Sequence, residues 1–167
     1  KLNNLLLDRH SGEPLCIIDL DTLMPGSPLF DIADLLRTTI STGAEDEADP
    51  SRIDCRLDVL AAVYRGFLGE IGDTLSAAER ALLPQCAPLL AYECGLRFLA
   101  DHLEGDRYFR IHRSDHNRQR ARAQFALVAA CERHATAIAD ICQELAPPGT
   151  TDLSPHCDGR HPMQEPQ

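Results

Sequence analysis

Two short apolar runs near the N-terminus are separated by a segment rich in turn-forming residues. The runs cover residues 5–7 and 15–21, and residues 8–14 between them include Asp, Ser, Gly and Pro. These residue types favour tight turns because they adopt backbone conformations that other residues avoid. Two apolar runs joined in this way predict a β-hairpin at the start of the chain.

Three polar side chains stand at the open end of the predicted hairpin. An antiparallel pairing places the start of one strand beside the end of the other, so we expect Asn4 to lie close to Asp19 and Asp21. Amide and carboxylate oxygens are hard ligands of the kind that Mg²⁺ prefers. The alternative, that these are ordinary turn residues beside strand ends, stays open at this point.

The chain from about residue 31 to residue 145 has the periodicity of helices. Apolar residues recur every three or four positions, which is typical of helices with one buried face. Asp31 is a candidate cap of the first helix, and Ser76 with Glu79 has the capping-box pattern. We therefore expect an α+β, mostly helical fold in which the hairpin is followed by a helical bundle. The expected helices cover residues 32–42, 53–71, 77–83, 84–104 and 115–145.

Three of these helices have a clear predicted buried stripe. The stripe of the helix at 53–71 is Ile53, Leu57, Leu60, Tyr64, Phe67 and Ile71. The stripe of the helix that ends near residue 104 is Leu89, Tyr92, Leu96, Leu99 and Leu103. The stripe of the last helix is Val128, Cys131, Ala135, Ile138, Cys142 and Leu145.

Charge is distributed unevenly along the chain. The formal net charge is -10 at pH 7, which argues against a nucleic-acid partner because such binding needs a basic face. Acidic residues gather in the loop 43–51, which we expect to be solvated. Arginines gather in residues 107–122. They form either a solvated face with ion pairs to acidic loops, or contacts to an anion or polyol through their planar donor forks.

The sequence also bears on the compartment. No stretch approaches the roughly 20 apolar residues of a membrane span, and no signal peptide is recognisable. The 7 cysteines include no Cys-x-x-Cys pair, which favours reduced, mostly buried thiols. A cytoplasmic protein without a membrane partner is therefore expected.

The last segment, residues 146–167, is rich in proline and lacks periodicity, so we expect a disordered tail. It contains His156, Cys157 and His161, whose spacing fits no standard zinc pattern. We interpret these residues as part of the tail.

The N-terminal segment resembles the metal-binding half of the aminoglycoside phosphotransferase and choline kinase-like family. The resemblance is carried by Asn4, the two apolar runs, Ile18-Asp19, Met24-Pro25-Gly26 and Phe30-Asp31-Ile32-Ala33-Asp34. It implies a protein-kinase-like C-terminal lobe over residues 1–145. Within it, residues 1–22 would be a metal-binding hairpin and residues 31–145 the helical part.

The resemblance implies a role for four residues. Asn4 and Asp19 would hold the Mg²⁺ that bridges the phosphates of ATP, so Mg²⁺ and ATP are the expected cofactors. Asp21 would lie just behind these ligands or serve the structure alone. Asp31 would brace the loops around the active site.

In this family a His-x-Asp pair that supplies the catalytic base precedes the metal-binding Asn. The matching Asp would lie upstream of Lys1, so no catalytic residue is expected in this chain. No glycine-rich phosphate loop occurs in the 167 residues either. The polypeptide is therefore expected to be a fragment that is inactive alone and needs an N-terminal lobe as its partner.

Parts of the chain are similar to one branch of the family, the N-acetylhexosamine 1-kinases, which phosphorylate the anomeric hydroxyl of N-acetylglucosamine or N-acetylgalactosamine. The similar segments are residues 19–26, 95–109 and 116–125. This similarity implies that Arg97 and Tyr108 contact the sugar.

Several alternatives remain. Arg97 could instead pair with Asp101, one helical turn on. The acceptor could be an aminoglycoside, choline or homoserine, although the arginines of residues 107–122 favour a neutral or anionic sugar. Outside the family, the chain could be a non-catalytic helical module that binds a protein or a small ligand in a groove between its helices.

Overall fold

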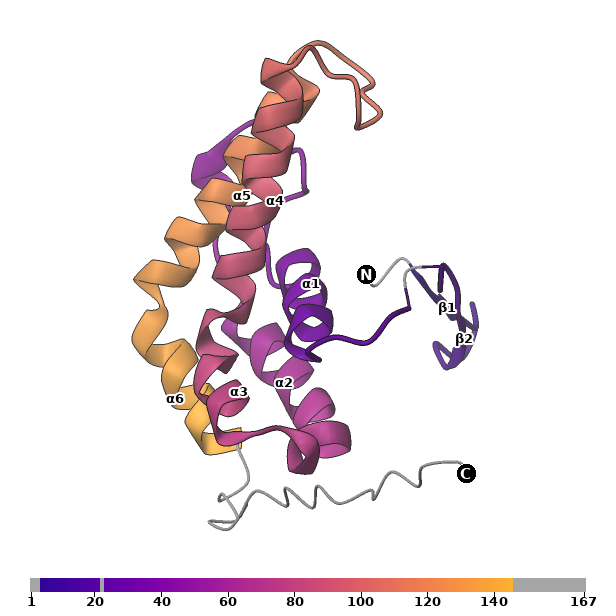
Figure 1. Cartoon of the computed structure of the whole chain (residues 1–167), viewed down its shortest axis with the longest axis vertical. Helices are drawn as coiled ribbons and strands as arrows, with labels where there is room; N and C mark the ends of the chain where they lie inside the picture. The colour runs from indigo at the N-terminus through magenta and orange to yellow at the C-terminus, as the bar shows by residue number, and fades with distance from the viewer. Residues whose placement is uncertain (1–3, 22, 146–167) are drawn as a thin grey trace, which may run out of the picture.

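A computed structural model describes residues 4–21 and 23–145, so the predicted tail with His156, Cys157 and His161 lies outside the described residues. The described part is mostly helical and begins with a two-stranded hairpin, as predicted (Figure 1). The strands are β1 (Leu5–Leu7) and β2 (Pro14–Ile17). The α-helices are α1 (Leu29–Thr39), α2 (Leu57–Ile71), α3 (Ala77–Leu82), α4 (Cys86–Leu103), α5 (His116–Arg133) and α6 (Ala135–Leu145). Short 3₁₀ helices are η2 (Pro50–Arg52), η3 (Gly72–Thr74) and η4 (Leu83–Gln85).

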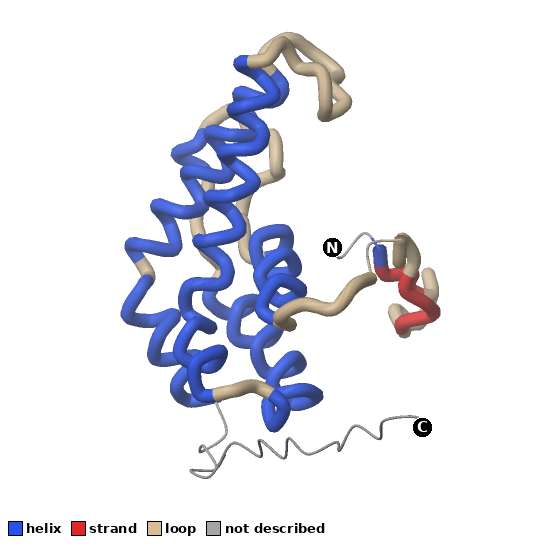
Figure 2. Tube along the Cα trace, in the orientation of Figure 1, coloured by secondary structure: helices blue, strands red, loops and turns tan. Residues whose placement is uncertain are grey.

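The helices pack on one another and leave the hairpin to one side. Helices α4 and α5 run antiparallel along most of their length, with α1 against α4 and α2 against α6 (Figures 1 and 2). A loop connects the hairpin to α1 (Figure 2). The largest fully buried side chains all belong to the helical part and the η4 turn: Tyr64, Ile32, Leu36, Ile40, Leu60, Leu83, Leu127, Ile138, Asn117 and Cys131.

Tyr64 connects several elements at the centre of this core. Its hydroxyl donates a hydrogen bond to the carbonyl of Leu83, and burial raises the pKa of the phenol. Burial also raises the pKa of Cys86 and of Cys142 to about 11 each. Both thiols are therefore protonated at neutral pH and behave as small apolar groups in the core.

The buried face of α4 differs from the predicted one. Leu89, Tyr92 and Leu96 of the predicted stripe are exposed, and so is Leu103. The helix instead buries small residues such as Gly95, where an added Cβ would lie 2.6 Å from Cε1 of Phe125 on α5. The two helices approach closely at Gly95, so the buried face of α4 carries mainly small residues there, whereas the sequence periodicity marks the face with the larger residues.

Two helix boundaries also differ from prediction. Helix α2 begins at Leu57, and Ile53 is buried in the loop before it. The long helix expected over 115–145 is broken at His134 into α5 and α6. Of its predicted stripe, Cys131, Ile138 and Cys142 are buried, but Ala135, which follows the break directly, is exposed.

The capping box before α3 is confirmed. The Ser76 hydroxyl accepts the backbone N–H of Glu79, and the Glu79 carboxylate accepts the backbone N–H of Ser76, at 3.2 and 3.0 Å. The other Glu79 oxygen accepts the Ser27 hydroxyl at 3.0 Å. The capped helix therefore also holds the segment that leads into α1.

The acidic loop 43–51 is tied down rather than freely solvated. Asp46 accepts a hydrogen bond from Arg113 at 2.9 Å, which lowers the pKa of Asp46. The Nδ1 atom of the buried His116 accepts a hydrogen bond from the backbone N–H of His112. The proton of the ring therefore lies on Nε2, which donates to the same Asp46 carboxylate at 3.1 Å. The expectation of a solvated loop is wrong for Asp46, and the expected ion pairing between the basic stretch and an acidic loop is confirmed for Arg113.

Candidate functional site

The hairpin brings Asn4 and Asp19 into direct contact. Its strands pair antiparallel with Leu5 opposite Ile17, and the N–H of Ile18 donates to the carbonyl of Asn4 at 2.8 Å. This pairing leaves the Asn4 amide 3.0 Å from Oδ2 of Asp19, to which it donates. The predicted proximity of these two side chains is therefore present in the structure.

Asp19 has an unusual backbone conformation. Its φ is 64°, in the left-handed region that few residues other than glycine, Asn and Asp adopt. Such conformations cost free energy and persist where the surrounding structure holds them, often at functional sites. Here the turn directs the Asp19 carboxylate to Asn4.

The opposite end of the hairpin is closed by local hydrogen bonds. The Asp8 carboxylate accepts the backbone N–H groups of Ser11 and His10 at 2.7 and 2.9 Å, and these bonds lower the pKa of Asp8. Gly12 completes the turn with a φ of 75°, which glycine adopts without strain. This tightly bonded turn fixes the strand register and hence the position of Asn4 opposite Asp19.

A cavity of about 1000 Å³ lies between the hairpin, the connecting loop and the first turns of α1. Asn4 and Asp19 line it from the hairpin, and Asp31 and Asp34 line it from α1. Asp31 is not the helix cap that we expected: α1 begins at Leu29, and the exposed Asp31 lies within its first turn. Asp21 is exposed at the end of the hairpin, and no described residue forms a hydrogen bond or ion pair with it.

The donor set at this cavity suits a hard divalent cation. Carboxylate and amide oxygens are the ligands that Mg²⁺ takes from proteins, usually one or two carboxylates together with phosphate oxygens of the substrate. In the structure Asn4 turns its amide nitrogen toward Asp19. Metal binding needs its oxygen on that side, which a half-turn of the amide group supplies. Among residues 4–21 and 23–145, no cluster of three or more His, Cys, Asp or Glu side chains is suited to a metal ion.

Arg97 and Tyr108 meet around the ring of Phe109. The Arg97 guanidinium lies 5.5 Å from the ring centroid, and the Tyr108 ring meets the same ring edge-on at 4.8 Å. Arg97 pairs with Glu93 at 3.7 Å and not with Asp101, so that alternative is wrong. Both Arg97 and Tyr108 are exposed, and neither lines the cavity beside Asn4.

Asp101 organises the loop that carries Tyr108. The sequence did not predict this role of Asp101. The buried carboxylate accepts the backbone N–H groups of Arg107, Tyr108 and Phe109 at 2.9, 2.7 and 3.0 Å. The fully buried Asn117 of α5 donates to the same carboxylate at 2.8 Å. Burial alone would raise the pKa of Asp101, but these donors together lower it.

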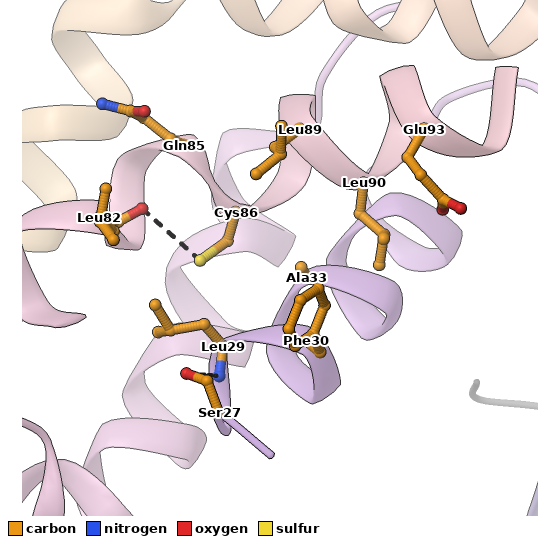
Figure 3. Close-up of a pocket in the computed structure, with 10 residues that line it drawn as sticks. All are labelled: Ser27, Leu29, Phe30, Ala33, Leu82, Gln85, Cys86, Leu89, Leu90 and Glu93. Carbon is orange, nitrogen blue, oxygen red and sulfur yellow. Dashed lines mark hydrogen bonds between the residues drawn. The ribbon is translucent and has the colours of Figure 1, made fainter. Parts of the chain in front are cut away.

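An apolar cleft of about 650 Å³ lies between α1 and the start of α4 (Figure 3). Phe30 and Ala33 line it from α1, and Leu89 and Leu90 line it from α4. Phe30 and Leu89 are largely exposed in this cleft. The cleft offers a surface for an apolar group but few polar groups for chemistry.

Within residues 4–21 and 23–145, no helix combines the length and the apolar character that crossing a bilayer requires.

Comparison with known families bears on the first part of the chain. A sequence model of the phosphotransferase enzyme family, APH, matches residues 1–65. The matched region contains the hairpin, α1 and the acidic loop, and therefore both Asn4 and Asp19. The match supports an assignment to the aminoglycoside phosphotransferase and choline kinase-like family, whose members transfer phosphoryl groups to small molecules.

Proposed function

We propose that this chain supplies the metal-binding lobe of an ATP- and Mg²⁺-dependent small-molecule kinase. The observation that carries the proposal is the convergence of Asn4 and Asp19 at the open end of a hairpin that lies inside the region matched by the phosphotransferase family. The proposal extends this family to the whole lobe, residues 1–145, with a protein-kinase-like arrangement.

In this function Asn4 and Asp19 bind the Mg²⁺ that neutralises charge on the nucleotide phosphates. Asp21 stands close behind them, and Asp31 braces the loops from the first turn of α1. These two supporting roles come from the resemblance alone, because Asp21 and Asp31 are exposed and neither forms a hydrogen bond or ion pair with a described residue. Catalysis also needs a base that accepts the proton of the acceptor hydroxyl, and we assign this role to no residue of this chain. We therefore expect no turnover from these 167 residues without a nucleotide-binding lobe.

The proposed acceptor is an N-acetylhexosamine, phosphorylated on its anomeric hydroxyl. Arg97 and Tyr108 support this choice, because a guanidinium donates to hydroxyl or acetamide oxygens and a tyrosine offers both a ring face and a hydroxyl. Both are exposed beside Phe109, where a sugar ring could reach them. Choline, homoserine and aminoglycosides are the alternative acceptors. A cytoplasmic location completes the proposal, since ATP is the phosphoryl donor.

The test is an ATP-consumption assay on the polypeptide encoded by the whole reading frame that contains this chain. The acceptors are N-acetylglucosamine, N-acetylgalactosamine, choline, homoserine and an aminoglycoside. We expect turnover with an N-acetylhexosamine that is lost in Asn4→Ala and Asp19→Asn. Glu13→Gln, which removes a carboxylate from the opposite end of the same hairpin, should retain activity. Turnover with another acceptor would discard the sugar, and activity that survives Asp19→Asn would discard the metal site.

One observation favours a second candidate function, a helical binding module. The apolar cleft between α1 and α4 exposes Phe30 and Leu89 (Figure 3). A binding module has no need for metal at Asn4 and Asp19. Absence of both turnover and Mg²⁺-dependent nucleotide binding would therefore favour this alternative.

A further inference from the structure

We propose that a small cavity between the end of α1, the acidic loop and α5 is a binding site for a small neutral polyol. The cavity measures about 180 Å³. Arg37 and Ser41 line it from the end of α1, Glu45 from the acidic loop, and Gln124 from α5. It shares no lining residue with the cavity beside Asn4 and Asp19, so this inference is independent of the proposed kinase function.

The first reason is an unused polar group. Gln124 is only 4% exposed, yet no described residue hydrogen-bonds to its side chain, and its Oε1 is shielded from solvent. Buried amides nearly always have partners, because an unsatisfied buried acceptor or donor destabilises the folded state. A glutamine that lines a cavity without any partner therefore indicates that the partner is a molecule that enters the cavity.

A second unused group lies close by. Nε of Arg120, one turn before Gln124 on α5, is buried and has no hydrogen-bond partner. It lies 3.9 Å from Oε2 of Glu45, which is within ion-pair distance but too far for a hydrogen bond. A hydroxyl near these groups can accept from the guanidinium and donate to the carboxylate.

The charges around the cavity balance, which argues for a neutral ligand. Arg37 donates to Asp34 at 2.7 Å and to Glu45 at 3.2 Å, and it is almost fully buried. The residues that line the cavity therefore carry one guanidinium, that of Arg37, and one carboxylate, that of Glu45. An added anion would meet Glu45, and an added cation would meet Arg37, so a charged ligand would be buried beside a like charge.

The mixture of unused donors and acceptors favours hydroxyl groups. Gln124 offers an amide donor and an acceptor, Arg120 a donor, and Glu45 an acceptor. A hydroxyl both donates and accepts, so a molecule with several hydroxyls can satisfy all of these groups. The volume would hold about six water molecules at roughly 30 Å³ each, which sets the size at that of glycerol or erythritol.

The experiment is a titration of the full chain with glycerol and with erythritol, followed by ¹H–¹⁵N NMR. We expect saturable shifts in the side-chain amide of Gln124 and in the backbone amides of Gly43 and Ala44. Acetate and guanidinium, added at equal concentration and ionic strength, should cause no saturable shift at these positions. Saturation by either ion to the same degree would contradict a neutral-polyol site.

Gln124→Met tests the key residue while keeping the fold. Met has a shape similar to that of Gln but lacks the amide group, so it leaves no buried hydrogen-bonding atom without a partner. We therefore expect the variant to melt at the same or a higher temperature. Its affinity for erythritol should fall by at least tenfold. Gln143→Leu, at an exposed position on α6, is the control and should bind as the unchanged chain does. The proposal is overturned if neither polyol gives a saturable shift, which would leave water as the occupant, or if Gln124→Met binds equally well.

Discussion

The hairpin and the helical part differ in how they are held together. None of the described residues 4–21 is buried, and the hairpin depends on strand hydrogen bonds and on the Asp8 turn. The helical part buries a continuous core around residues such as Leu36 and Tyr64. An isolated two-stranded hairpin is marginal in water. The region with the proposed metal ligands is therefore the region with the least packing of its own.

This difference indicates that the hairpin needs a partner surface to cover its apolar side chains. Its apolar side chains, Leu15 and Ile17 among them, face solvent, although residues of this kind usually lie against a partner surface. In the proposed kinase, the nucleotide-binding lobe would supply that surface and the cavity beside Asn4 would become a cleft between two lobes. The helical part serves as the scaffold, and the loop after β2 connects the two regions.

The largest contrast is expected from matched leucine substitutions in the two regions. Leu36→Ala empties a fully buried position in α1 and should lower the free energy of unfolding by about 2–5 kcal/mol. Leu15→Ala, at a position 66% exposed in β2, should change it by less than about 0.5 kcal/mol. Urea denaturation followed by circular dichroism measures both. A similar loss in the two variants would show that the hairpin is part of the cooperative core.

The close approach of α4 and α5 predicts the next effect. Gly95→Val places methyl groups against Phe125, and we expect a loss of about 1–3 kcal/mol from overpacking. The control is Gly66→Ala on α2, where an added Cβ meets nothing within 4 Å. That change should stabilise the chain by about 0.5–1 kcal/mol through helix propensity. Thermal melting of both variants gives the comparison, and a neutral Gly95→Val would contradict the packing of these helices.

The loop that carries Tyr108 should depend on Asp101. Asp101→Asn replaces an acceptor of four hydrogen bonds by a group that can accept fewer, so the amides of Arg107, Tyr108 and Phe109 should exchange on the order of tenfold faster. Hydrogen exchange by NMR measures this. Asp115→Asn is the control, since Asp115 pairs with Arg118 at the surface. Unchanged exchange in Asp101→Asn would mean that the carboxylate does not hold the loop.

The same carboxylate predicts a pH dependence. The folded pKa of Asp101 lies below its ordinary value, so the ionised carboxylate stabilises the folded chain. This stabilisation is fully present above the unfolded pKa of about 3.9 and is lost as the pH falls through the folded pKa. The amide shifts of residues 107–109 should therefore be constant from neutral pH to about pH 4 and change below it. Asp101→Asn should lack this transition, and its persistence in that variant would assign the transition to another group.

The smallest effect is expected at the capping box. Ser76→Ala removes the side-chain acceptor for the first turn of α3 and should cost about 1 kcal/mol. Ser114→Ala is a matched change just before α5, where the serine forms no hydrogen bond in the described part of the chain, and should have no measurable effect. Chemical denaturation of the two variants compares them, and equal stabilities would contradict the capping role of Ser76.

The features that the sequence predicted correctly depend on short-range rules. The hairpin and the contact of Asn4 with Asp19 follow from the turn between two apolar runs, and the Ser76–Glu79 box depends on residues three apart. The metal-binding roles of Asn4 and Asp19 stay predictions, as do the sugar contacts of Arg97 and Tyr108.

The features that the sequence missed depend on tertiary contacts. The buried face of α4 is set by how closely α5 approaches at Gly95, which periodicity does not report. Asp101 is buried because the following loop folds back over it, and Asp46 pairs with Arg113, 67 positions along the chain. No local pattern indicates a partner at that separation, although an arginine-rich stretch in an acidic chain did suggest that such pairs exist.

The most direct test of the central claim is Mn²⁺ binding at the open end of the hairpin, with Mn²⁺ as a paramagnetic substitute for Mg²⁺. In ¹H–¹⁵N spectra of the chain, low Mn²⁺ concentrations should broaden the signals of Asn4 and Asp19 before those of Glu13, and excess Mg²⁺ should restore them. Asp19→Asn keeps a residue that tolerates the left-handed conformation but removes the charge, so the selective broadening should disappear. Broadening that is uniform along the hairpin, or that persists in Asp19→Asn, would contradict the metal site.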